Sequence, residues 1–207
     1  MKTLLVIAPL FLLASAQVVA APANIPGELK YDRLAAFHER GGEGRSYGVS
    51  GQALLGGRFL VGGQASEESF PFLGDISGRS TGFTLGYKFT EATGDFLITV
   101  TRSQIRASGG AGAVTWELDG EATTLGLTWR QRLSDAFEGF VGYGHTSRRE
   151  TARATIGGVV TSSLGRDYEG ALNLALRYNA TANVDVTFGY AIVPGGNVWS
   201  IGTGYNF

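Results

Sequence analysis

The chain has 207 residues, with 17 basic and 18 acidic side chains and a formal net charge of −1 at pH 7. It contains no cysteine, which excludes disulfide bridges and cysteine metal sites. Because charges of both signs are mixed along the chain without a basic block, we expect no nucleic-acid partner. We likewise expect no cofactor and no metal site.

The N-terminus has the pattern of an export signal. Lys2 is followed by an apolar run over residues 4–13 and by the small residues Ala14-Ser15-Ala16. We therefore predict a signal peptide over residues 1–20, with cleavage after residue 16 or residue 20, and a single domain over residues 21–207. The apolar run is shorter than the roughly 20 residues that a transmembrane helix needs, and no later segment approaches that length.

The first segments after the signal alternate only weakly between apolar and polar residues. Residues 31–38 form a candidate strand whose outward side is ambiguous. Residues 47–55 and 58–65 alternate around Val49, Ala53, Phe59 and Val61. Such alternation predicts strands, because successive side chains of a strand point to opposite faces.

The later segments alternate strongly, and each has one apolar face and one face of small, polar or charged residues. They cover residues 83–89, 96–101, 124–130, 137–144, 171–178, 184–191 and 199–207. In residues 83–89, for example, Phe83, Leu85, Tyr87 and Phe89 share one face. No segment after the signal has a helical period.

Short and long connections alternate between these segments. Short turns are predicted near residues 56–57, 91–94, 134–135 and 180–183, and longer loops over residues 66–80, 107–119 and 151–166. Outer-membrane barrels combine short periplasmic turns with longer external loops. The pattern predicts an all-β, antiparallel, up-and-down transmembrane β-barrel of ten strands, with eight strands as the alternative if the first two segments are not strands.

Two features favour a membrane barrel over a soluble β-sandwich. The polar face is rich in small residues, which fit the narrow interior of a small barrel. Aromatic residues gather at the ends of the apolar segments, where interfacial girdles form. The small residues are Gly82, Gly86, Gly126, Gly142, Gly144, Ala171, Ala175, Gly189, Gly202 and Gly204. The aromatic residues are Tyr87, Phe89, Trp129, Phe137, Tyr143, Tyr178, Tyr190, Trp199, Tyr205 and Phe207.

The chain ends in Gly202-Thr203-Gly204-Tyr205-Asn206-Phe207, an alternating strand that closes on an aromatic residue. This ending is similar to the assembly signal of Gram-negative outer-membrane barrels, and the whole pattern resembles the small barrels of the OmpA and OmpX types. The resemblance implies a location in the bacterial outer membrane. It also implies that Tyr205 and Phe207 are read by the barrel-insertion machinery.

Charged residues on the predicted inward face form a candidate network. They are Lys88, Arg130, Arg132, Glu138, Glu169, Arg177 and Asp185. An isolated charge inside a barrel is costly, so we expect Glu138 to pair with Arg130 and Asp185 with Arg177. The network is interpreted as a polar core that fills and stiffens the barrel, and the alternative is the lining of a narrow pore.

His145, Ser147 and Glu150 are the candidates for catalysis. His145 and Ser147 lie two residues apart and so share one face of a strand, and a carboxylate could orient the imidazole. The His145-Thr146-Ser147 sequence resembles that of outer-membrane lipid A deacylases, without the asparagine expected next in that family. An ordinary polar strand end is the preferred interpretation, so we expect no enzyme.

The surface offers the remaining functional candidates. Arg148 and Arg149 could contact lipopolysaccharide phosphates. The apolar residues 69–73 and Trp116 lie in predicted external loops, where recognition usually occurs. The leading hypothesis is a non-enzymatic surface protein with a structural or adhesin-like role through its loops, and outer-membrane lipid and lipopolysaccharide as neighbours. The alternatives are a narrow channel for small solutes and, less favoured, a lipid A-modifying enzyme.

Overall fold

The computed structural model describes residues 29, 31–41, 44–70, 76–91, 94–194 and 196–207. The predicted signal peptide lies outside these residues, as do residues 71–73 of the apolar segment. The described residues form ten strands: β1 (Arg33–Gly41), β2 (Gly44–Leu55), β3 (Phe59–Phe70), β4 (Ile76–Glu91), β5 (Gly94–Ala111), β6 (Val114–Arg132), β7 (Phe137–Ile156), β8 (Val159–Asn179), β9 (Val184–Val193) and β10 (Gly196–Asn206). Within the described part of the chain, no helix has the length and apolarity that a membrane-crossing helix needs.

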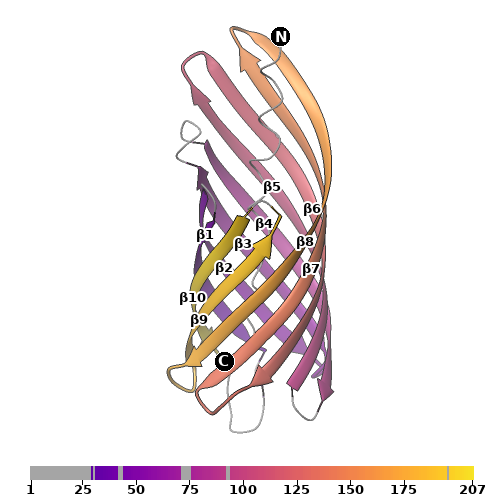
Figure 1. The fold of residues 1–207 in the computed structure, drawn as a ribbon, viewed down its shortest axis with the longest axis vertical. Helices are drawn as coiled ribbons and strands as arrows, with labels where there is room; N and C mark the ends of the chain where they lie inside the picture. The colour runs from indigo at the N-terminus through magenta and orange to yellow at the C-terminus, as the bar shows by residue number, and fades with distance from the viewer. Residues whose placement is uncertain (1–28, 30, 42–43, 71–75, 92–93, 195) are drawn as a thin grey trace.

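The ten strands form one closed antiparallel barrel (Figure 1). Each strand pairs with its sequence neighbours, and β1 pairs with β10 from Arg33 opposite Asn206 to Gly41 opposite Val198. The predicted fold class and the count of ten strands are therefore confirmed. Since the first weak segment is a full strand, the eight-strand alternative is wrong.

The barrel wall is much taller on one side than on the other. Strands β5 to β8 have 18 to 21 residues, whereas β1, β9 and β10 have 9 to 11. In Figure 1, β5 to β8 accordingly reach far above the upper ends of β9 and β10. We call this upper part of β5 to β8 the extension, its end of the barrel the tall end, and the opposite end, where the C-terminus lies, the terminal end.

The extension corrects the prediction of long loops. Most of residues 107–119 and 151–166 lie in strands, and the second hairpin turns tightly at Gly157 and Gly158, whose φ angles of 59° and 87° suit glycine. Cross-strand ion pairs accompany the pairing, for example between Arg102 and Glu121 at 2.9 Å. In β5 and β6 the outward residues of these segments are polar and the apolar ones, such as Ile105 and Leu118, are buried on the inward face. The alternation is the reverse of that in the apolar belt, so the outward apolar pattern does not reveal these segments as strands.

The outward face between the two ends is an apolar belt. Its apolar side chains are largely exposed on the barrel surface, with 55% of Leu125 and 59% of Val49 accessible. Contact of so many apolar side chains with water would be unfavourable. Other members are Phe83, Leu85, Ile98, Val100, Leu127, Val141, Leu172, Leu174, Phe188 and Ile201. A continuous apolar exterior around a polar interior is the arrangement that a bilayer stabilises.

Aromatic rings border this belt at both ends. Near the terminal end, the centroids of Phe96 and Trp129 lie 4.9 Å apart, and those of Phe137 and Tyr178 lie 5.2 Å apart. Toward the tall end, Tyr190 and Trp199 meet at 5.0 Å. Rings of this kind rest between hydrocarbon and water in membrane barrels. The structure therefore has the architecture of a small outer-membrane β-barrel.

Strand β1 is ambiguous in sequence because it carries an aromatic ring inside the barrel. Leu34 faces outward, whereas Phe37 lies opposite Gly48 of β2. A Cβ atom at residue 48 would approach the Phe37 ring to 2.4 Å. Glycine at that position therefore makes room for the ring.

Candidate functional site

Near the terminal end, a layer of charged side chains crosses the barrel interior; we call it the ion-pair layer. Three of its arginines, Arg33, Arg130 and Arg177, are at most 1% exposed, although they come from β1, β6 and β8. Asp185 and Glu138 are equally enclosed, at 0% and 3%. Buried charges persist only when they are paired and hydrogen-bonded, so the partners of each group determine what the layer can do.

Asp185 of β9 joins two of the arginines. Arg33 donates from Nη2 to Asp185 Oδ1 at 2.5 Å and from Nε to Oδ2 at 3.0 Å, which is a bidentate pair. Arg177 Nε lies 3.6 Å from Oδ1, and Asn206 of β10 donates to Oδ2 at 3.1 Å. The expected contact of Asp185 with Arg177 is thus present. Arg33 makes the closer pair, which the sequence did not reveal.

Glu138 of β7 has the same role for the next pair along the layer. Arg130 donates to Glu138 Oε2 from Nη2 at 2.6 Å and from Nε at 3.1 Å. Arg177 Nη1 lies 3.5 Å from the same oxygen, and Asn179 donates to Oε1 at 3.4 Å. The structure therefore brings Glu138 together with Arg130, as expected, and adds Arg177.

Tyr31, which precedes β1, closes the remaining side of the layer from within the barrel. It is 2% exposed, and its hydroxyl donates to Asp95 Oδ2 of β5 at 2.5 Å. The Arg130 guanidinium lies 4.8 Å and the Lys88 ammonium 5.0 Å from the centre of its ring. These are distances at which cations are attracted to an aromatic face.

Apolar contacts complete the layer. Phe140 lies under the guanidinium groups of Arg130 and Arg177, at 5.4 Å and 4.9 Å. It also belongs to a buried cluster with Tyr31, Leu60 and Leu97. Side chains from opposite walls therefore meet across the lumen. This filled cross-section leaves little room for solute at this level.

Strand β10 has a glycine, Gly204, where the Arg33 side chain of the ion-pair layer packs against it. A Cβ atom at residue 204 would lie 2.1 Å from Arg33 Nε, so glycine is needed where the guanidinium passes β10. Tyr205 and Phe207 point outward and are 54% and 60% exposed, while Asn206 points inward to Asp185. The C-terminal residues therefore contribute aromatic rings to the outward face and a hydrogen bond to the ion-pair layer inside.

Two residues of the predicted network lie elsewhere. Arg132 is the last residue of β6, at the rim of the barrel, and pairs there with the exposed Asp135 of the β6–β7 turn at 2.8 Å. Glu169 faces inward but lies opposite Thr146, well above the layer on β8. The predicted network was therefore wrong to include Arg132 and Glu169, which the structure separates from the other five residues.

A second cluster of charged side chains, Glu68, Arg148 and Glu150, lies inside the tall end of the barrel. It is above the apolar belt, because the outward face at this height is polar at Glu67 and Arg149. Arg148 Nη1 lies 3.1 Å from Glu150 Oε1 on the inward face of β7. Burial raises the pKa of the Glu68 carboxyl to about 7, against the opposing effect of Arg148. Burial likewise raises the pKa of Glu150.

The catalytic candidates are not brought together. His145 and Ser147 share the outward face of β7, as expected, and the His145 ring stacks on Tyr168 with centroids 6.4 Å apart. Glu150 occupies the inward face and contacts Arg148, so the barrel wall separates this carboxylate from the imidazole. Among the described residues, no group of three metal-binding side chains occurs either.

The chain resembles outer-membrane barrels. The NanC porin structure matches 85% of this chain and all of its own, with 8% identity and a TM-score of 0.49. The KdgM porin in complex with disordered oligogalacturonate matches 84% of this chain and 99% of its own, with 12% identity and a TM-score of 0.48. Ail, the attachment invasion locus protein of Yersinia pestis, matches 85% and 99%, with 14% identity and a TM-score of 0.39.

These similarities concern the fold alone. In sequence, no protein-family model and no characterised protein matches the chain. What the chain does therefore has to be inferred from its own interior and surface.

Proposed function

We propose that this protein resides in the bacterial outer membrane and acts there as a non-enzymatic surface-interaction protein. Its barrel is the anchor, and the extension of β5 to β8 is the binding surface. Recognition then takes place on strands and not on the loops expected from the sequence. Outer-membrane lipid and lipopolysaccharide are its expected neighbours, with the outward Arg149 placed near the phosphates.

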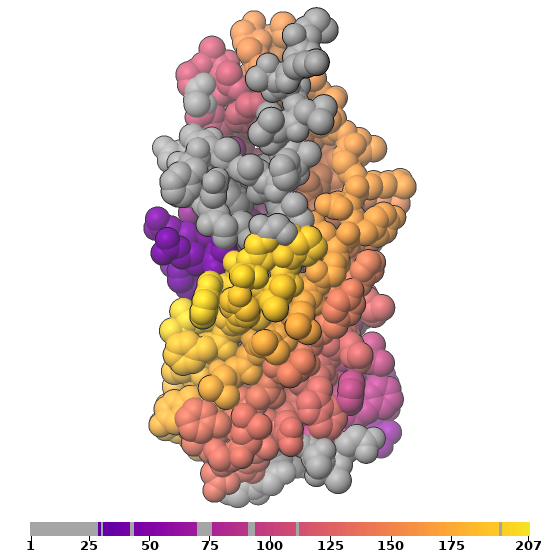
Figure 2. Space-filling model, in the orientation of Figure 1, coloured from indigo at the N-terminus to yellow at the C-terminus, as the bar shows by residue number. Residues whose placement is uncertain are grey.

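The free edge of β8 is the observation that carries the proposal. β8 pairs with β9 only from Leu172 to Asn179, while it pairs with β7 along its whole length. Residues 159–171 therefore have no strand partner on one side among the described residues. At about 3.3 Å per residue, this edge is roughly 43 Å long. Figure 2 shows the orange atoms of β8 along the upper right of the molecule.

An open edge of this kind can bind an extended segment of another protein as an added strand. About every second residue of the edge presents both its N–H and its C=O outward, which supplies main-chain affinity. Side chains on the outward face then supply selectivity. Leu164 is 74% exposed and Val160 63%, and exposed apolar residues above the membrane are suitable anchors.

A channel is the less favoured function because the ion-pair layer crosses the lumen. We expect purified mature protein in planar bilayers to show no steady conductance, since Tyr31, Phe140 and the paired arginines fill the cross-section. Single-channel recording over a range of voltages measures this. A stable conductance step that scales with protein insertion would replace the surface-interaction proposal with a channel.

Charge at the free edge should abolish strand addition. We expect the double variant Val160→Lys, Leu164→Lys to capture extended peptides at least about tenfold less well than the wild type, because lysines on an edge oppose pairing. The measurement pans cells that display the protein against a phage library of unstructured peptides and quantifies recovered phage.

The chain offers a matched control for this experiment. Thr155 and Thr151 of β7 lie directly opposite Val160 and Leu164, on the same outward face but one strand away from the edge. The variant Thr151→Lys, Thr155→Lys adds the same charge at the same height and should retain capture. Equal capture by wild type and edge variant, or no enrichment with wild type, contradicts the proposal.

A further inference from the structure

Two arginines face each other on the outward side of the β1–β2 hairpin, at the tall end of these strands. Arg40 of β1 lies directly opposite Arg45 of β2, and both side chains are exposed. Like charges in opposite positions of a strand pair repel each other and weaken the pairing. A bound anion between the two guanidinium groups would make their proximity favourable.

The outward face around this pair offers no free acid. Within the described part of the chain, the side chains of Arg40 and Arg45 form no ion pair and no hydrogen bond. The outward acid on the next strand is Glu67, which lies opposite Tyr47 and is paired with Arg79 at 3.0 Å. Other outward arginines of the tall end have acidic partners, so this pair is the exception on its side of the barrel.

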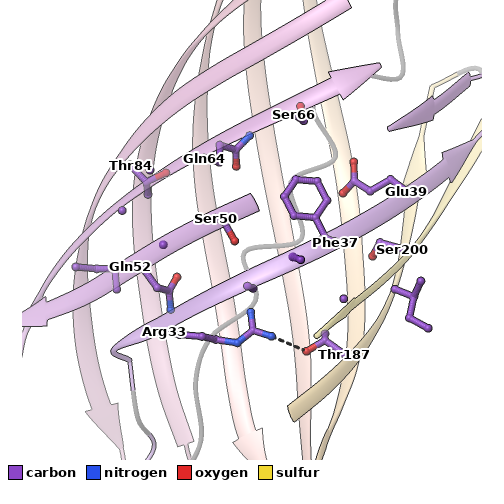
Figure 3. A pocket seen from close by; sticks show the side chains of 18 residues that line it. Arg33, Phe37, Glu39, Ser50, Gln52, Gln64, Ser66, Thr84, Thr187 and Ser200 are labelled. Atoms are coloured by element: carbon purple, nitrogen blue, oxygen red, sulfur yellow. Dashed lines mark hydrogen bonds between the residues drawn. The ribbon is translucent and has the colours of Figure 1, made fainter. Parts of the chain in front are cut away.

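Two other acids are close to the pair in sequence. Glu39 precedes Arg40 but points inward, where it lines a cavity of about 70 Å³ inside the barrel together with Phe37 (Figure 3). It forms no ion pair with either arginine. Glu43 belongs to the turn between the two strands and lies outside the described residues. Glu43→Gln is therefore one of the variants that test the site.

The arginine pair lies at the level of the tall-end aromatic residues. Arg40 is opposite Trp199 of β10, and Trp199 contacts Tyr190 at 5.0 Å in the ring pair that borders the apolar belt. One step toward the terminal end, the rings of His38 and Tyr47 stack with their centroids 4.4 Å apart. Aromatic residues of this kind mark the headgroup region of a bilayer. The two arginines are therefore within reach of headgroup phosphates.

An open groove on the outward face continues from these rings toward the terminal end. Ala36 and Val49 form the next outward pair below His38 and Tyr47, and both line the groove. Its outward lining includes Leu34, Ala36, Val49, Gly51, Gly63 and Ala65. Because four of these residues carry a methyl group or no side chain, the apolar belt is hollowed here. A depression of this kind can be filled by an acyl chain.

We propose that a lipid A molecule binds at this place, with a phosphate between Arg40 and Arg45 and an acyl chain in the groove. A phosphate monoester carries about −1.5 to −2 charges at pH 7, which matches two arginines. The phosphodiester of a phospholipid has no second ionisable oxygen. Guanidinium groups bind phosphate through paired hydrogen bonds. The site rests on the outer-membrane location proposed above and is independent of peptide capture at the β8 edge.

Native mass spectrometry of the refolded mature protein in detergent tests the site, with bis-phosphorylated lipid A as the probe. One lipid A per wild-type barrel is expected. The double variant Arg40→Gln, Arg45→Gln should bind it at least about tenfold more weakly, because both phosphate ligands are lost. Lipid A without phosphates should bind the wild type as weakly, and phosphatidylglycerol should not displace lipid A.

The chain offers a matched control for the loss of charge. Arg102→Gln, Arg106→Gln removes two exposed arginines from the same outward surface, but each of these has an acidic partner, at 2.9 Å and 3.5 Å. This variant should keep the wild-type affinity for lipid A.

The groove is tested by Gly63→Leu. A Cβ atom at residue 63 would lie 3.6 Å from the closest atom beyond its chain neighbours, so the barrel accommodates the side chain. The leucine then occupies the groove and should lower the affinity for lipid A several-fold. An unchanged affinity would show that no acyl chain lies in the groove and would overturn that part of the proposal.

Three further outcomes would overturn the arginine site. One is equal binding of lipid A by the wild type and the Arg40→Gln, Arg45→Gln variant. Another is displacement by phosphatidylglycerol, which would make the pair a general contact for anionic lipids. The last is tighter binding by Glu43→Gln, which would mean that Glu43 neutralises the pair in the wild type. Peptide capture should be equal in the arginine variant and the wild type, so a failed lipid site leaves the surface-interaction proposal intact.

Discussion

Replacing Glu138 with alanine is expected to destabilise the barrel by about 3–5 kcal/mol, the cost of leaving a buried charge without its partner. Glu138 Oε2 accepts both hydrogen bonds of Arg130 and is also the closest acidic oxygen to Arg177 Nη1. Both arginines are 0% exposed, so water cannot replace the lost carboxylate without opening the layer. Urea unfolding of the mature protein in lipid vesicles, followed by tryptophan fluorescence, measures the effect.

Asp135 provides the comparison for Glu138. It also forms an ion pair with an arginine of β6, Arg132 at 2.8 Å, but its side chain is fully exposed. Asp135→Ala should therefore leave the free energy of unfolding unchanged within error. Glu138→Gln should fall between the two, because it removes the charge and keeps an acceptor for Arg130. A Glu138→Ala loss no larger than that of Asp135→Ala would show that the layer does not stabilise the barrel.

The local part of the ion-pair layer could be predicted from sequence. Arg130 and Glu138 lie on consecutive strands joined by a short turn, so period-two alternation places both inside and close together. Asp185 and Arg177 are related in the same way by the β8–β9 turn. Each pair depends on a single hairpin, and alternation is sufficient to orient a hairpin.

The non-local part could not be predicted. Arg33 and Asp185 are 152 residues apart and meet only because β1, β10 and β9 are neighbours in the closed barrel. Tyr31 lies before the first strand and has no alternating neighbours to orient it. The inward position of Asp95 could be predicted, because Asp95 alternates with the outward residues Phe96 and Ile98 along the strand.

The extension was missed for a different physical reason. Above the apolar belt the outward face is in water, and the apolar residues of β5 and β6, such as Ile105 and Leu118, lie on the inward face instead. The alternation is therefore reversed there, so the outward apolar pattern of the lower segments does not continue into the extension. Opposite charges also face each other across β5 and β6, such as Arg106 with Asp119 and Arg102 with Glu121. Those pairs are visible in sequence only after the hairpins are known.

Deleting Phe207 is expected to reduce the amount of folded protein in the outer membrane several-fold, with a matching rise of unfolded protein in the periplasm. The side chain is 60% exposed on the outward face, so its removal leaves no cavity in the barrel interior. Its backbone N–H donates to the Asp32 carbonyl at 3.3 Å, which is one contact among the many that join β10 to β1. The expected loss therefore concerns assembly rather than the stability of the finished barrel.

The variant Phe188→Ala distinguishes a specific role of Phe207 in assembly from a general contribution of lipid-facing rings. It is 53% exposed on the same lipid-facing surface, in the middle of β9, so Phe188→Ala removes a similar apolar contact away from the C-terminus. If Phe207 acts as an assembly signal, Phe188→Ala inserts normally in cells, and the chain lacking Phe207 refolds in detergent with a urea midpoint close to that of the wild type. If the two changes reduce insertion equally, then Phe207 is one more lipid-facing ring. The aromatic ending would then act by contact with the bilayer and not by recognition.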